Sequence, residues 1–180
     1  MSEVAERYRS LARGLTARVE GVPPGGWDRP SPCAGWRARD VVGHLAEWMP
    51  GMFFDGAGLP RPAIPTADED PAGAWRALDE ALQSALDDPV TASRPCGPFA
   101  LEEAFDRFGL PDVLVHTWDL ARATGQDEAL DEGEVRRLLA AMASVDEELM
   151  RGSGHFGPRV EVPDDADEQT RLLAFTGRQP

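Results

Sequence analysis

The sequence predicts an all-α protein in which amphipathic helices are joined by long connections. Apolar residues recur every three or four positions in successive segments, which is the period of a helix with one buried face. Prolines and glycines gather between those segments, and strand patterns are almost absent outside residues 160–162. Because 180 residues suit one core, we expect a single helical domain over residues 1–180.

The first helix is expected over residues 2–20, where an apolar stripe runs along one side. The run GVPPGGW ends it, because proline and glycine interrupt helices. The second helix is expected over about residues 37–49, and Pro50 with Gly51 should stop it. Residues 51–71 are rich in proline and glycine and predict a long irregular connection, a kind of segment that often covers a site.

The remaining helices have weaker boundaries. They are expected over about residues 72–86, 111–124, 131–149 and 165–175. Pro111 suits the first turn of its helix, and Gly125 suits the left-handed position that follows a helix end. A short extended piece at 160–162 precedes the last helix.

The net charge of −14, from 32 acidic and 18 basic residues, limits the partners that the protein can have. Such a surface repels phosphate backbones and anionic lipids, so we expect neither nucleic-acid binding nor membrane-surface binding. No run is apolar enough to span a bilayer, and the charged N-terminus is no signal peptide, which predicts a cytoplasmic protein. Two cysteines, Cys33 and Cys96, are too few for a multi-cysteine zinc site and are expected as free thiols. The absence of lysine and asparagine weakly indicates a bacterium with a GC-rich genome.

Three side chains suggest a metal site. His44 and His116 lie within or beside apolar helical stripes, where an imidazole needs a hydrogen-bond partner or a metal. Asp112 precedes His116 by four residues, so both side chains lie on one face of a helix. His44 from a neighbouring antiparallel helix would complete a set of two imidazoles and one carboxylate with open coordination positions. The alternative is an exposed ion pair between Asp112 and His116, with His44 as an ordinary core histidine.

Three runs of sequence resemble a known family. SPCAGWRARDVVGHLAEW (31–48) resembles the second-helix motif of the DinB-like proteins related to mycothiol-dependent maleylpyruvate isomerase. DVLVHTWDLARATG (112–125) resembles the fourth-helix motif of the same proteins, and FGPRVEVPDDADEQTRLLAFTGRQP (156–180) resembles the ending of many small actinobacterial members.

The resemblance implies a DinB-like up-down-down-up four-helix bundle, here with extra C-terminal helices, that binds one divalent metal ion, usually zinc or nickel. The ligand positions of the family fall on His44, Asp112 and His116 of this sequence. Two features depart from the family. The acidic ligand there is typically glutamate, or a third histidine in other branches. The isomerase itself has a separate C-terminal domain, whereas a short tail is expected after the helical domain of this sequence.

Three functional hypotheses follow from the resemblance. The first is a metal-dependent transferase or isomerase that acts with a low-molecular-weight thiol such as mycothiol and an electrophilic substrate. The second is a non-catalytic metal-binding or stress-related accessory module, and the third is a bundle whose site has decayed. For self-association we expect a homodimer.

Other polar residues have simpler interpretations. We expect His155 in a solvated loop, Cys33 as a small buried residue or a thiol near the site, and Asp119 as an exposed acid or a partner of Arg122. Asp40 either orients His44 or complements the helix dipole, and the second role is favoured. The tryptophans at 36, 48 and 118 are expected as core or pocket walls.

Overall fold

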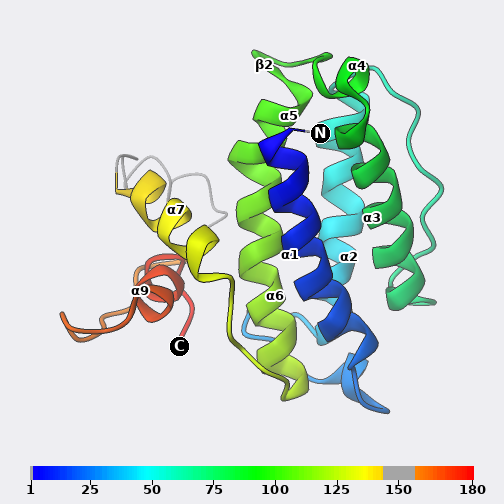
Figure 1. Ribbon diagram of the computed structural model, residues 1–180. Coiled ribbons are helices and arrows are strands. Elements are labelled where there is room, and N and C mark those ends of the chain that lie inside the picture. The colour runs from blue at the N-terminus through cyan, green and yellow to red at the C-terminus, as the bar shows by residue number, and fades with distance from the viewer. Residues whose placement is uncertain (1, 144–156) are drawn as a thin grey trace. The chain divides into compact units, whose positions relative to one another are not determined.

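The computed structural model describes residues 2–143 and 157–180, and these are mostly helical, with one two-stranded sheet (Figure 1). The prediction of an all-α class is therefore confirmed. The chain divides into two compact units, residues 1–128 and residues 129–180. A single domain over residues 1–180 stays a prediction. Among the described residues, no helix combines the length and the apolar character needed to cross a membrane.

Four long helices of the first unit enclose its core. They are α1 (Glu3–Glu20), α2 (Ala38–Met49), α3 (Pro71–Asp87) and α6 (Leu110–Thr124). Helix α1 packs against α3 and α6, and α2 packs against the same two helices, so the four lie side by side (Figure 1). The large side chains between them are fully buried, among them Tyr8, Trp75, Phe105 and Trp118. The up-down-down-up order of a DinB-like bundle stays a prediction.

Side chains at the helix starts explain where these helices begin. The hydroxyl of Ser2 accepts a hydrogen bond from the backbone N–H of Ala5, and Asp70 accepts one from Gly73. Each satisfies an N–H group that has no partner within its helix. At the start of α2, the Asp40 carboxylate accepts the backbone N–H of Arg37 at 2.7 Å. Asp40 is thus bound to the helix start, as the favoured interpretation expected, and it also accepts hydrogen bonds from the Arg37 guanidinium.

Two π-helical turns were not predicted. The proline at position 50 does not end the helical path, because the chain continues as a π-helical turn, η2 (Pro50–Asp55), directly after α2. A second such turn, η3 (Phe105–Gly109), leads into α6. The wider i→i+5 pattern accommodates a proline that lacks an N–H and crowds the preceding turn. The α-helix thus ends at Met49, as predicted, but the irregular connection expected from residue 51 begins only after Asp55.

The remaining elements of the first unit are short. They are η1 (Gly26–Asp28), α4 (Pro89–Ala92), α5 (Leu101–Ala104) and the antiparallel strands β1 (Pro95–Cys96) and β2 (Phe99–Ala100). Gly97 has a φ of +62° in the turn between the strands, a conformation that glycine adopts without strain.

The second unit contains α7 (Glu132–Met142) and α9 (Glu168–Phe175), which pack against each other. Asp131 and Asp167 cap their N-termini by accepting backbone N–H groups. Residues 160–162, expected as an extended piece, form no strand, although the N–H of Val160 donates to the carbonyl of Ala174. Residues 144–149 of the fifth predicted helix, and His155, lie outside the described residues.

Tyr8, the single tyrosine of the chain, makes the first unit sensitive to alkaline pH. Its hydroxyl is fully buried and donates to Asp79 at 2.8 Å, and burial together with the Asp79 charge raises the pKa of Tyr8 well above 10. The unfolded chain therefore loses the tyrosine proton at a lower pH than the folded chain does. The free energy of unfolding should fall by about 1.4 kcal/mol for each pH unit above 10, until the raised pKa is reached.

Urea unfolding followed by tryptophan fluorescence measures this effect, because all five tryptophans lie within residues 1–128. In Tyr8→Phe the loss of stability between pH 9 and 11 should be much smaller than in the wild type. Equal losses in the two proteins would show that Tyr8 is not the titrating group.

Candidate metal centre

The structure brings His44, Asp112 and His116 together. His44 extends from the middle of α2, Asp112 from the first turn of α6, and His116 from the next turn of α6. The Nε2 atom of His44 lies 3.2 Å from Asp112 Oδ2, and the Nε2 atom of His116 lies 3.3 Å from Asp112 Oδ1. One possible ligand atom from each residue lies within 4.8 Å of the other two. Two helices separated by sixty residues of sequence thus supply one cluster of donor atoms.

The cluster is buried on one side and reachable on the other. The side chain of His116 is 6% exposed, whereas those of His44 and Asp112 are 29% and 26% exposed. The partly exposed Trp36 ring is stacked on His116 and tilted against His44. Trp48 lies against the His44 ring and donates its indole N–H to Asp112 at 2.8 Å. The tryptophans at 36 and 48 are therefore walls of this site.

The charges of the cluster are strongly coupled. Burial by itself raises the pKa of Asp112, but the adjacent imidazoles of His116 and His44 outweigh it and hold that pKa well below its usual range. Burial would likewise lower the pKa of His116, yet the neighbouring carboxyl groups of Asp112 and Asp119 raise it well above its ordinary value. The imidazole of His116 is thus a site where positive charge is stabilised.

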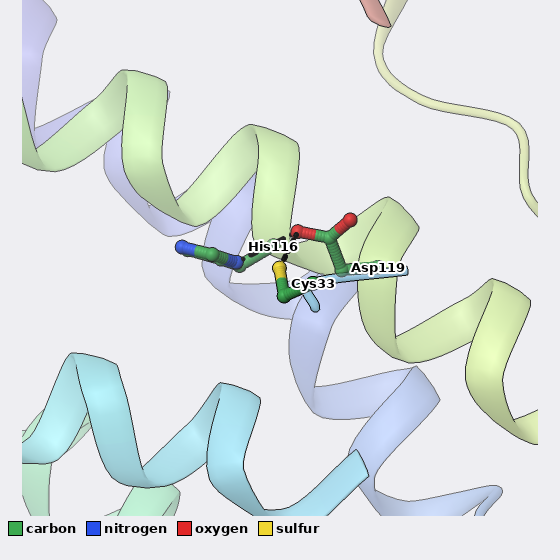
Figure 2. Close-up of side chains that lie close together, drawn as sticks. All are labelled: Cys33, His116 and Asp119. Atoms are coloured by element: carbon green, nitrogen blue, oxygen red, sulfur yellow. Dashed lines mark hydrogen bonds and ion pairs between the residues drawn. The ribbon is translucent and has the colours of Figure 1, made fainter. Parts of the chain in front are cut away.

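Asp119 is a site residue that the sequence analysis missed. The expectation of an exposed acid or a partner of Arg122 was wrong, because its side chain is completely buried and its Oδ2 lies 2.8 Å from His116 Nδ1 (Figure 2). Arg122 instead pairs with Glu128 at 2.7 Å and lies over the Trp118 ring. With its Nδ1–H donated to Asp119, His116 presents Nε2 to Asp112. Asp119 therefore sets the orientation of this imidazole.

Cys33 reaches the same carboxyl group from the loop before α2. Its thiol donates to Asp119 Oδ2 at 3.4 Å, and the side chain is partly buried, so it is a thiol near the site (Figure 2). Cys33, His116 and Asp119 form a second group of donor atoms within 4.8 Å of one another. Cys96, by contrast, is buried in β1, where burial raises the pKa of its thiol.

The comparison with family models shows which family the chain belongs to. The model of the mycothiol maleylpyruvate isomerase N-terminal domain matches residues 8–121. The chain belongs to this family. The matched region includes both histidines and both carboxyl groups of the site, so the cluster lies within the part of the chain that carries the family membership.

Relatives of this family member cover nearly its whole length. Uncharacterized protein Rv0738 of Mycobacterium tuberculosis (strain ATCC 25618 / H37Rv) is 32% identical over 180 residues, which cover 96% of this chain and 94% of the relative. Uncharacterized protein MT0763 of strain CDC 1551 / Oshkosh matches with the same identity and coverage. No solved structure matches the chain.

The donor atoms of the family member suit a divalent cation. Two imidazole nitrogens and a carboxylate are the ligand types of catalytic zinc sites and of facial sites for other transition metals. The hydrogen bond between His116 and Asp119 supplies the support that metal-bound histidines usually have. The carboxyl groups of Asp112 and Asp119 that stabilise a proton on His116 would also attract a cation, which would bind there in competition with that proton.

The burial of Asp119 predicts a large difference between two substitutions. Asp119→Ala should lower the free energy of unfolding by about 3 kcal/mol, because it leaves the buried Nδ1–H of His116 without its acceptor and removes one of the two carboxyl groups beside that imidazole. Arg122→Ala, which removes an exposed ion pair with Glu128, should cost at most about 1 kcal/mol. Urea unfolding measures both, and similar losses would contradict the assignment of Asp119 to the site.

Proposed function

We propose that His44, Asp112 and His116 hold one divalent metal ion, zinc or nickel, and that the protein is a thiol-dependent transferase or isomerase. The observation that carries the proposal is the convergence of three donor atoms from α2 and α6 within 4.8 Å. Membership in the mycothiol maleylpyruvate isomerase N-terminal family supports a small-molecule thiol, with mycothiol as the first candidate. The partner of the thiol is an electrophilic substrate.

The residues around the proposed metal ligands have separate roles. A divalent ion bound here would supply a Lewis acid that lowers the pKa of a thiol and keeps it as thiolate at neutral pH. Asp119 holds His116 in one orientation, and Trp36 fixes the ring from its face. Trp48 donates to Asp112 and so limits the rotation of that carboxylate. The ligand geometry is therefore set before any substrate arrives, which reduces the cost of reorganisation.

The partial exposure of the site favours an enzyme over a purely structural metal module. A closed structural site usually has four protein ligands, whereas this group has three within the described residues. His44 and Asp112 are both reachable from solvent, so a thiol sulfur could approach on their side. The substrate is an electrophile that accepts the sulfur or rearranges after its addition. The predicted homodimer and cytoplasmic location stay predictions.

Metal analysis tests the ligand set directly. Protein purified without chelators and dialysed should contain close to one zinc or nickel ion per chain by plasma mass spectrometry. His116→Ala should abolish binding, and His44→Ala or Asp112→Ala should weaken it at least about tenfold, because each removes one of three ligands. The control is His155→Ala, which changes the remaining histidine of the chain. No bound metal in the wild type, and no uptake on titration, would refute the proposal.

Thiol binding can be tested apart from turnover. Cobalt(II)-loaded protein should develop a sulfur-to-cobalt charge-transfer band when mycothiol is added, and the S-methyl derivative of mycothiol should give no such band. Mycothiol-dependent consumption of an electrophile should then stop on chelation and return when metal is restored. A charge-transfer band without turnover across a broad panel of electrophiles would favour the non-catalytic module.

A further inference from the structure

Two exposed apolar side chains lie close to the candidate metal centre along the sequence. Among the described residues, the large hydrophobic side chains that are exposed are Met52, Val90 and Phe108. Met52 lies in η2, four residues after Trp48, and Phe108 lies in η3, four residues before Asp112. Residues four apart share one face of an α-helix, and four residues also make up roughly one turn of a π-helix, so both extend the face that carries the site. Val90 lies elsewhere, on the short helix α4.

The contacts between the two segments place Met52 level with Phe108. His44 contacts both Asp112 and His116, whereas Trp48, one turn later, contacts Asp112. The segment formed by α2 and η2 therefore runs antiparallel to the segment formed by η3 and α6, so later residues of the first lie beside earlier residues of the second. One further turn leads to Met52 on one segment and to Phe108 on the other.

A buried aromatic pair at the same level supports this placement. The rings of Phe53 and Phe105 lie with their centroids 4.9 Å apart, and Phe53 also contacts Trp48. Phe53 follows Met52 directly in η2, and Phe105 lies in the same π-helical turn as Phe108. Each segment therefore buries one aromatic ring against the other and leaves a second apolar side chain partly exposed, 37% for Met52 and 44% for Phe108. The Phe108 ring also lies 6.3 Å from the ring of Phe99, which leaves its remaining surface open to solvent.

We propose that Met52 and Phe108 form an apolar subsite for an alkyl or aryl group of the electrophilic substrate. The proposal rests on the proposed function, because the metal centre defines where the reacting atoms lie. Four residues of helix rise about 6 Å, so the apolar group would lie about one turn from Asp112. Covering the two exposed side chains with an apolar group removes hydrophobic surface from water and favours substrates that carry such a group.

Two hydroxamates of different length test the subsite without requiring turnover. Acetohydroxamate chelates the metal and has no tail, whereas 4-phenylbutanohydroxamate adds a flexible arm that can span about 6 Å. Calorimetry with zinc-loaded wild type should show about tenfold tighter binding of the longer compound, a gain typical of one partly buried aromatic group.

The variants separate the subsite from general effects. Met52→Gln combined with Phe108→Gln should remove most of this gain while leaving zinc content and acetohydroxamate affinity unchanged, because neither residue is a proposed ligand. The matched control is Val90→Gln, which makes the same change at an exposed position on α4 and should retain the full gain.

The outcomes distinguish the two proposals. If zinc-loaded wild type binds acetohydroxamate but the phenylbutyl tail adds nothing, or if the gain survives in the double variant, the subsite is overturned and the metal centre stands. If light scattering shows a wild-type dimer that the double variant converts to monomer, this face binds a second copy of the chain, and the subsite is again overturned. If acetohydroxamate does not bind and no metal is held, both proposals fall.

Discussion

The carboxylate of Asp112 joins two helices, and the candidate site depends on that junction. From α2 it receives the His44 imidazole and the Trp48 indole N–H, and from its own helix it receives His116. A half-buried carboxylate is stable only where neighbouring donors or charges compensate for lost hydration. These contacts supply that compensation, and they hold α2 and α6 in the register that faces the two imidazoles. Without Asp112, no carboxylate would contact both imidazoles and hold them close together.

The sequence was sufficient to nominate these three residues but not Asp119. The spacing of Asp112 and His116 places both on one helical face, and the family resemblance adds His44. Local spacing and the family motif were therefore enough to predict the three residues. Asp119 follows His116 by three residues and precedes Arg122 by three, a pattern equally typical of an exposed helix. Its burial depends on tertiary packing, with the loop that carries Cys33 reaching the same carboxyl group. The spacing of residues along a helix does not show whether another segment of the chain buries them.

The same distinction explains the fold. Apolar periodicity located the long helices to within a few residues, because their stripes and caps are local features. The two π-helical turns were missed because proline usually ends a helix, and at Pro50 the contact between Phe53 and Phe105 favours continuation. The hairpin of β1 and β2 has two residues in each strand, too few to show an alternating pattern. At Pro50 a nonlocal contact thus outweighs a local preference, whereas the hairpin is simply too short to give a sequence pattern.

The cluster around His116 is difficult to explain by stability alone. A buried carboxyl group such as Asp119 loses hydration, and well-packed apolar residues of similar volume often stabilise a protein as much as a buried polar pair does. The protein nevertheless places carboxyl groups on both nitrogens of one imidazole, with a thiol on the inner carboxyl group and solvent access at the outer one. Such an arrangement fixes the position and the charge of a nitrogen donor, which hydrophobic packing cannot do. We infer that the role of the buried polar cluster is to position the His116 nitrogen donor, and not to increase the stability of the fold.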